Sequence, residues 1–580
     1  MFFKKSMLAV AAVSMLFAFG ACKKGEIATD FKKGEIATDF KSAVALTAKW
    51  NKSDVNSLLG YIPADAIAYA FNTHNFDINS PEYQGIMKWG LALSENVIKT
   101  ADKQLAAGDV DPEQKAAIES TKTYMSGIIA LMKDYKTLAP EWGLDPNMHS
   151  DSVMFISDSN AVAIMTVSDG EKFKTKMTGI FDSLKTVSEE FDYIKSTVGE
   201  GENVWEVYAA KEAIDGTTIT PAIAINITKT IITAAIINGT TPDPAKLAEL
   251  KKPAAKSLTQ KELGKINDKT GMIAKLDNVR LFELINDPQF AEMLKDENGE
   301  PIVSPECMKD TTKLISMMPS ATMVYNFDSP TSYSSHAVLS LDANELKKIH
   351  ALHTPSIDLV NDKSIAGVKV NLNIEQAINY ITDLSSRLAQ AQITCSSYQE
   401  LVDLLKELPA QIANPMIAPY VKGITGINGA LDALDTKTFK LEGAINITGP
   451  KIGELVPGLL AMGKGIAPEV ADKFNLTKDA ATTIDFSKLA DLPVTVNATY
   501  TDQDIMFATA SRGDVVSLAK TAKTNRHNFF EIYLSSDFMN IANDENVDFS
   551  TLFNGAEFNY TMGFGSNEQG LTMDVIYNFK

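Results

Sequence analysis

A single local pattern recurs along this chain and limits the folds open to it. A strand-like run, alternating or rich in β-branched residues, ends at a polar residue and passes into a helical pattern with apolar residues three or four apart. The polar residue suits a helix N-terminus, because its side chain accepts an amide hydrogen that has no partner within the helix. Such strand-to-helix units are predicted at 161–177, 272–285, 336–349, 368–381, 439–455 and 529–541.

Several of the predicted strands also have a hairpin partner. The pairs are 218–228 with 230–237, 494–500 with 505–510, and 560–564 with 571–579. The apolar stretch 219–237 has the length of a transmembrane segment, but Lys229, Asn226 and several threonines in or beside its middle argue against that assignment.

Helical blocks interrupt this β-rich background. They form two predicted helical pairs, 83–107 with 112–138 and 374–391 with 398–412. The fold class that follows is α+β, with twisted antiparallel sheets that carry helices on one face.

The chain is too long for one core, since its 580 residues predict between two and four domains. Three prolines and many lysines coincide at 241–264, which predicts a boundary there. We therefore expect an N-terminal α+β domain at 53–250 and a C-terminal α+β region at 265–580, with a further division near 413–435.

The N-terminus reads as a lipoprotein signal peptide. Lys4 and Lys5 precede an uncharged stretch at 7–21, which is too short to span a bilayer core of about 30 Å but fits a signal peptide. The stretch ends in Phe19-Gly20-Ala21-Cys22, which resembles a bacterial lipobox with Phe where Leu is usual. We predict a signal peptide at 1–21 and a lipid on Cys22. The alternative is an ordinary secretory signal in which Cys22 has no role.

The residues after Cys22 favour a tether. The nine residues KKGEIATDF occur at 23–31 and again, identically, at 32–40. A linker accepts such an insertion easily, since each doubling of its length costs about 0.6 kcal/mol, whereas a packed domain must find partners for the added backbone. We predict a flexible tether at 22–52.

Charge restricts the partners. The formal net charge of −19 becomes −21 once Lys4 and Lys5 leave with the signal peptide. Such acidity argues against nucleic acid as a partner and against a body lying flat on anionic lipid. The expected membrane partner is therefore reached through the lipid on Cys22, at the outer membrane, since Lys23 and not Asp follows the cysteine. Whether the protein faces the periplasm or the cell surface stays open.

Only Cys307 and Cys395 remain beyond Cys22. Two thiols in an oxidising compartment often pair, and a bridge closing so long a loop contributes about 4 kcal/mol in the loop-entropy model. Two buried thiols far apart are the alternative; we favour the disulfide.

No motif predicts a catalytic residue, a metal site or a cofactor. Gly458–Gly465 is one residue short of a nucleotide-binding P-loop, because Gly465 stands where Ser or Thr would hold Mg²⁺ and helix is predicted before it. The histidine grouping at His336, His350 and His353, with Glu345 nearby, lies beside Lys347 and Lys348 and is predicted to face solvent.

Three further motifs are weak. Asp296–Gly299 has the wrong spacing for a calcium loop, and Glu189-Glu190 reads as a solvated helix face. The spacing of Gly423, Gly426 and Gly429 predicts a flexible connection or a close helix contact in preference to a phosphate cradle.

Tyr61-Ile62-Pro63-Ala64-Asp65-Ala66, which leads into a predicted strand at 67–72, resembles the opening of a family of large lipoproteins from Bacteroidota-type bacteria. The family is classed as a domain of unknown function, and the likeness covers the first domain. The resemblance implies the location and the fold class, and it carries over no catalytic residues.

Two functions of different class follow as expectations. The first is a non-enzymatic binding or scaffold lipoprotein that takes a protein, a glycan or an apolar ligand, or whose partner surface is itself structural. The second is a glycan-directed envelope hydrolase with carboxylates dispersed along the chain. A cleft with two inward carboxylates about 5–10 Å apart would favour the hydrolase, and an apolar groove without clustered acids would favour binding.

The anchor makes the first testable prediction. We expect the protein to incorporate radiolabelled palmitate in growing cells and the Cys22→Ser variant to incorporate none. Label retained by the variant would contradict the anchor, and protease digestion of whole cells would distinguish the two sides of the outer membrane.

Overall fold

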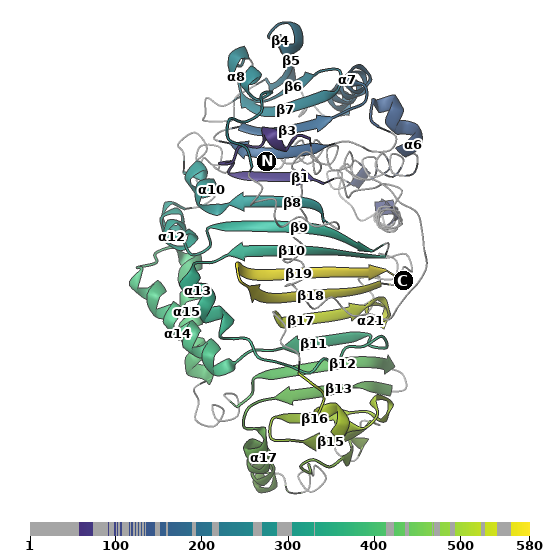
Figure 1. The fold of residues 1–580 in the computed structure, drawn as a ribbon, viewed down its shortest axis with the longest axis vertical. Coiled ribbons are helices and arrows are strands. Elements are labelled where there is room, and N and C mark those ends of the chain that lie inside the picture. The colour runs from purple at the N-terminus through teal and green to yellow at the C-terminus, as the bar shows by residue number, and fades with distance from the viewer. Residues whose placement is uncertain are drawn as a thin grey trace. The chain divides into compact units, whose positions relative to one another are not determined.

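The computed structural model describes most of the chain after residue 56. The described residues are 57–73, isolated positions between 91 and 133, 135–145, 151–157, 160–187, 193–211, 220–239, 241–258, 270–286, 304–329, 331–412, 423–435, 440–466, 468, 476–487, 494–523, 528–541 and 558–579. They form a mixed α+β structure built on antiparallel sheet (Figure 1).

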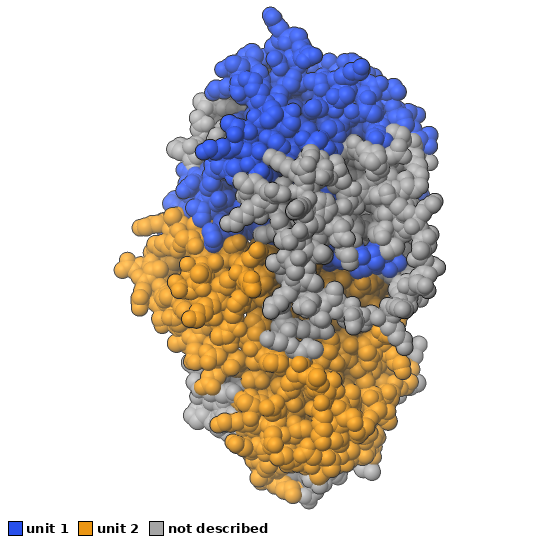
Figure 2. Space-filling model, in the orientation of Figure 1, with its two compact units in different colours: residues 1–308, 319–335 blue, residues 309–318, 336–580 orange. Residues whose placement is uncertain are grey.

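The chain divides into two compact units, coloured separately in Figure 2. Unit 1 comprises residues 1–308 and 319–335, and unit 2 comprises residues 309–318 and 336–580. The segment 241–264, where we predicted a domain boundary, falls within unit 1; there Pro244–Glu249 form helix α8, and Leu247 and Leu258 are buried.

Unit 1 contains a nine-stranded antiparallel sheet in the order β4-β5-β6-β7-β3-β2-β1-β8-β9. The strands are β1 (Ala68–Asn72), β2 (Ser152–Ser157), β3 (Asn160–Thr166), β4 (Tyr193–Val198), β5 (Trp205–Ala210), β6 (Pro221–Ile227), β7 (Ile231–Asn238), β8 (Thr270–Asp277) and β9 (Ser320–Ser329). The helical elements are η1 (Leu59–Tyr61), α6 (Tyr135–Leu138), η2 (Ala139–Trp142), α7 (Gly170–Val187), η4 (Gly201–Asn203), α8 and α10 (Asn278–Ile285).

Both faces of this sheet are buried around its centre. Helix α7 packs Phe173 against Tyr208 of β5, whereas α8 packs Leu247 against Val207, the next residue of the same strand. Successive residues of a strand point to opposite faces, so the two helices lie on opposite sides of the sheet. The structure therefore differs from the prediction of helices on one face, because the central strands carry apolar side chains on both faces.

All the strands belong to one large sheet, and the part that we call the unit 2 sheet has the strand order β10-β19-β18-β17-β11-β12-β13-β16-β15-β14, antiparallel from β19 to β14. Its strands are β10 (Ser332–Ser340), β11 (Ala366–Val370), β12 (Gly426–Asp435), β13 (Lys440–Thr448), β14 (Thr482–Asp485), β15 (Thr495–Tyr500), β16 (Asp504–Ala508), β17 (Asn528–Ser535), β18 (Phe558–Asn567) and β19 (Gly570–Phe579). The helices that follow α12 (Pro305–Ile315) are α13 (Ala343–His350), α14 (Ile374–Gln390), α15 (Ser396–Ile412), α17 (Ile452–Ile466), η5 (Ala510–Arg512), α20 (Val515–Ala519) and α21 (Ser536–Ile541).

The predicted strand-to-helix units are confirmed, and in several of them the polar residue at the junction caps the helix. Asp277, Asp342 and Asn373 each accept a backbone N–H from the first turn of the helix that follows. The predicted hairpins at 218–237, 494–510 and 560–579 are also present, the first as β6 and β7, which confirms that 219–237 is not one long helix.

Of the two predicted helical pairs, the structure describes only the second in full. The second pair is confirmed as α14 and α15. The first, at 83–138, lies mostly outside the described residues, apart from α6 and isolated helical positions.

A carboxylate of α12 holds the turn between α14 and α15. Asp310 is fully buried and accepts the backbone N–H groups of Thr394 and Cys395 at the start of α15, the latter at 2.7 Å. Its other oxygen pairs with Lys313, whose ammonium also donates to the Ala391 carbonyl at 2.7 Å. These donors, the Lys313 ammonium first, hold the pKa of Asp310 well below its usual range.

A covalent bond lies beside this carboxylate. Cys307, one helical turn before Asp310 on α12, is disulfide-bonded to Cys395. The bond and the carboxylate both hold the N-terminus of α15, and the apolar contacts of Leu314 with Leu388, Ile393 and Val402 lie beneath them.

We expect Asp310→Asn to lower the urea midpoint of unfolding at pH 7, because the neutral amide loses the charge that binds Lys313. The folded pKa of Asp310 is lowered, so its stabilisation is present above the ordinary carboxyl pKa near 4 and is lost as the pH falls toward the folded value. The gap between the two proteins should therefore close below about pH 4, as measured by urea titration at several pH values.

Asp403→Asn is the matched control, since Asp403 is an exposed carboxylate of α15 that pairs only with Lys406 and Gln399 among the described residues. We expect it to leave the midpoint nearly unchanged. An equal loss in both variants would contradict the role given to Asp310.

Candidate functional site

One face of the unit 2 sheet is apolar across six neighbouring strands. Cross-strand pairs in an antiparallel sheet point to the same side, so the register defines the face residue by residue. We call the following residues the apolar face: Met573, Val575 and Tyr577 of β19; Tyr560, Met562 and Phe564 of β18; Phe530, Ile532 and Leu534 of β17; Ala366, Val368 and Val370 of β11; Ile427, Gly429 and Leu431 of β12; Ile445 and Ile447 of β13. None of them is charged.

The centre of this face is open to solvent. Ile445 is 50 % exposed and Val368 is 40 % exposed, and Met573 is exposed at the β19 side. None of the hydrophobic clusters formed by the described residues includes these three side chains. Burying apolar surface stabilises a protein by about 25 cal/mol for each Å², so the exposed side chains at the centre of this face contribute less stability than buried ones would and make the face a candidate binding surface.

Helix α17 bounds the apolar face on one side. Its Ile452 and Val456 pack on Ile505 of β16 and reach Ile447, the last residue of the apolar face on β13. The face is therefore continuous with a buried apolar core at this end and opens from β13 towards β19.

The opposite face of the same strands is covered, and a row of polar side chains crosses it; we call it the polar face. Lys369 of β11 lies between Glu531 of β17 and Asn428 of β12 in the register, and Asn446 of β13 lies next to Asn428. All four are buried. The Lys369 ammonium lies 2.9 Å from a Glu531 oxygen and 2.7 Å from an oxygen of Asp358.

The buried polar row formed by Glu531, Lys369, Asn428 and Asn446 lowers the stability of the fold at Asn428. Asn428 is fully buried, and neither its amide nitrogen nor its amide oxygen has a hydrogen-bond partner within the described part of the chain. An unsatisfied buried polar atom costs about 1–3 kcal/mol. The sheet thus buries a row of polar side chains on its covered face, while apolar side chains on the other face are exposed.

The segment 354–365, which we call the covering segment, lies over the polar face. Its Ile357 and Leu359 pack with Ala430 and Met506, and α20 contributes Val515 and Ala519 to the same cluster. Gly367 of β11 allows the close approach, because a Cβ there would come within 2.5 Å of a Val360 methyl carbon.

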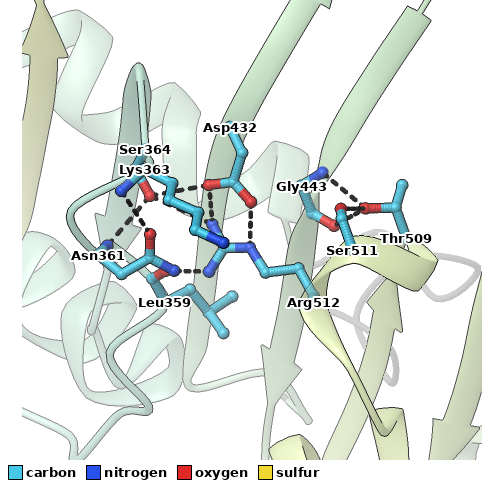
Figure 3. Close-up of polar contacts among 9 residues, drawn as sticks. All are labelled: Leu359, Asn361, Lys363, Ser364, Asp432, Gly443, Thr509, Ser511 and Arg512. Atoms are coloured by element: carbon cyan, nitrogen blue, oxygen red, sulfur yellow. Dashed lines mark hydrogen bonds and ion pairs between the residues drawn. The ribbon is translucent and has the colours of Figure 1, made fainter.

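Arg512 binds both the covering segment and the sheet (Figure 3). The guanidinium of Arg512, at the end of η5, donates to both carboxylate oxygens of Asp432 on β12, and the two side chains are almost fully buried. It also donates to the Leu359 carbonyl at 2.5 Å and to the Ser364 hydroxyl at 3.2 Å, both in the covering segment. A planar guanidinium fits this bidentate geometry better than an ammonium does.

The histidines of the sequence prediction hold protein contacts, not a shared ligand. His336 pairs with Asp574 at 2.8 Å, His350 contacts the Asn567 carbonyl, and His353 contacts the Ser566 hydroxyl. His336 and His353 are half-buried in these contacts, whereas His350 is exposed, as predicted. Among the described residues no group of three or more His, Cys, Asp or Glu side chains is arranged to hold a metal.

Other motifs take ordinary structural positions. Gly458–Gly465 lies within α17, so the backbone there cannot wrap a phosphate. Gly426 and Gly429 belong to β12, which corrects the predicted flexible connection, because both residues pair across the sheet. Cys22, Glu189-Glu190 and Asp296–Gly299 lie outside the described residues.

The sequence held a partial signal for the apolar face. The clean alternation of 571–579 predicts one apolar side on β19. The alternation does not show which side of the strand another segment covers. From the sequence alone, the apolar side of such a strand would therefore be assigned to the buried core.

Comparisons of this chain with known protein families, sequences and structures found no significant match. No protein-family model matches the chain, and no curated protein sequence or solved structure is significantly similar to it. The function is therefore argued from the geometry of unit 2.

We expect Arg512→Met to lower the free energy of unfolding by about 3–5 kcal/mol, because it leaves the Asp432 carboxylate buried without a counter-charge. The double variant Arg512→Met with Asp432→Leu should recover much of that loss in urea titrations, since no unpaired charge remains. A double variant as unstable as the sum of the two single variants would contradict this account.

Proposed function

We propose that this chain is a lipid-anchored lipoprotein of the outer membrane with a non-enzymatic binding role, and that the apolar face of unit 2 takes an apolar ligand. The observation that carries the proposal is an uncharged face of six strands whose centre is exposed, backed by a buried polar row. The anchor on Cys22 is part of the proposal. Among the described helices none is long and apolar enough to cross a membrane.

A hydrolase finds less support in the described residues. A general acid needs a raised pKa, which comes from burial without a counter-charge. Asp358 and Glu531, the closest candidates, both contact the same Lys369 ammonium. Glu345 is buried against Arg387, which with Tyr380 and Lys348 outweighs the effect of burial and lowers its pKa. Each of these carboxylates is engaged by a cationic side chain of the same unit, so they suit structural pairing better than proton donation.

Ile445→Lys tests the proposal directly. We expect at least a tenfold weaker affinity for 1-N-phenylnaphthylamine, an uncharged fluorescent probe, because the ammonium would have to be desolvated beneath it. Since Ile445 is 50 % exposed, the urea midpoint should change little.

Leu404→Lys is the matched control, because Leu404 is 60 % exposed but lies on α15, away from the apolar face. It should bind the probe as the unaltered protein does. Equal affinity in both variants, or a loss confined to Leu404→Lys, would contradict the proposed site.

A further inference from the structure

We propose that Lys369 and Asn428 become joined by an isopeptide bond, which the chain forms between its own side chains on the polar face of unit 2. The bond is a covalent modification that is separate from the apolar face and from its ligand. Three features of the polar face support it: the register of the strands, the burial of the reacting amide and the carboxylate beside the lysine.

The register brings the lysine amine and the asparagine amide to one place. Lys369 of β11 is the direct cross-strand neighbour of Asn428 on β12 and of Glu531 on β17. Such neighbours point to the same face with their Cβ atoms about 4.5–5.5 Å apart, and the flexible four-carbon stem of lysine can bridge that gap. The bond therefore needs a rotation of side chains and no shift of the strands.

Asn428 is the suitable electrophile of the polar row. It is fully buried, and neither atom of its amide has a hydrogen-bond partner within the described part of the chain, so its reaction gives up no hydrogen bond there. Its amide is neutral, whereas the charge of a carboxylate repels an attacking amine. Asn446 is one strand further from Lys369, and its amide already donates to Asp504 and accepts from the Thr448 hydroxyl. The geometry therefore selects Asn428.

Glu531 is placed to take a proton from the amine. An ammonium has no lone pair, so Lys369 must lose a proton to an adjacent base before it can attack a carbonyl carbon. A Glu531 oxygen lies 2.9 Å from the Lys369 nitrogen, and both side chains are almost fully buried. Transfer of the proton removes two buried charges at once, which burial favours. The proton comes from the bound ammonium itself, so Glu531 does not act as the general acid that a hydrolase needs.

Asp358 holds the same amine from the covering segment. Its carboxylate lies 2.7 Å from the Lys369 nitrogen, but its side chain is 25 % exposed. Water can therefore continue to solvate its charge after the lysine has reacted. Glu531 is the buried one of the two carboxylates and is the proton acceptor.

The reaction is balanced by the loss of one ammonia. The lone pair of the Lys369 amine attacks Cγ of Asn428, a bond forms between Nζ and Cγ, and the bond from Cγ to Nδ2 breaks. Of the protons of the ammonium, one stays on the new amide nitrogen, one leaves with Nδ2 as ammonia and one stays on Glu531. No oxidant, reductant or further reactant is required.

The bond closes residues 370–427 into a covalent loop that contains α14 and α15. A crosslink of this kind constrains the unfolded chain as a disulfide does. Reducing agents cleave the disulfide between Cys307 and Cys395 but leave an amide intact. The isopeptide bond thus reinforces the sheet between β11 and β12 under conditions in which the disulfide is lost.

Peptide mapping of the purified protein tests the bond without any variant. A tryptic digest should contain a branched peptide in which residues 364–387, uncleaved after Lys369, are joined to residues 423–437, with the mass of one ammonia missing from the sum. Neither part contains a cysteine, so a disulfide does not account for the branch. Absence of the branched peptide would overturn the proposal. Loss of ammonia from 423–437 alone would also overturn it, because Asn428 would then have closed onto the backbone nitrogen of Gly429.

Glu531→Gln tests the proton transfer, because the amide has the same shape but does not take a proton from Lys369. We expect at least about tenfold less branched peptide, since general-base catalysis typically contributes about 100-fold or more. Glu442→Gln is the matched control: Glu442 is a partly exposed carboxylate of β13 that pairs with Lys440, and its loss should leave the branched peptide at the level of the unaltered protein. Equal branching in Glu531→Gln and Glu442→Gln would overturn the role of Glu531, and a branch that persists in Asn428→Ala would overturn the site.

Discussion

The buried ion pairs beneath the covering segment determine which face of the unit 2 sheet is closed. Lys369 joins Glu531 of the sheet to Asp358 of the covering segment, and Arg512 joins Asp432 of the sheet to the Leu359 carbonyl. Breaking a buried pair from one side costs about 3–5 kcal/mol, because the remaining charge stays desolvated. The covering segment therefore cannot exchange sides, and the apolar side chains of the same strands remain uncovered.

This arrangement is not the most stable one available to such strands. Well-packed apolar residues in place of a buried ion pair are often neutral or stabilising, and covering the apolar face would add hydrophobic stabilisation. The unit buries several polar residues, among them Asn428, which has no hydrogen-bond partner within the described part of the chain, and it leaves Val368, Ile445 and Met573 exposed. Departures from local consistency of this kind concentrate at functional sites, which is why we base the proposed function on this sheet.

Local structure could be predicted from the sequence because its signals are themselves local. Asp277, Asp342 and Asn373 end their strands and cap their helices through side chains that reach only two or three residues along the chain. The hairpin of β18 and β19 follows in the same way from alternation within each strand. The predicted restriction of helices to one face failed, because α17 and α20 contact the sheet on opposite sides through Ile505 and Met506, neighbours on one strand.

The sequence by itself determined the α+β class, the strand-to-helix units and the overall acidity, all of which depend on residue spacing or on composition. Only the tertiary structure decided that Lys369, Asn428 and Asn446 form one buried row and that Val368 and Ile445 share one exposed face. The physical reason is the period of two in a strand: each strand specifies two sides, but the side that becomes buried depends on contacts between segments as distant as Asp358 and Glu531 or Asp432 and Arg512.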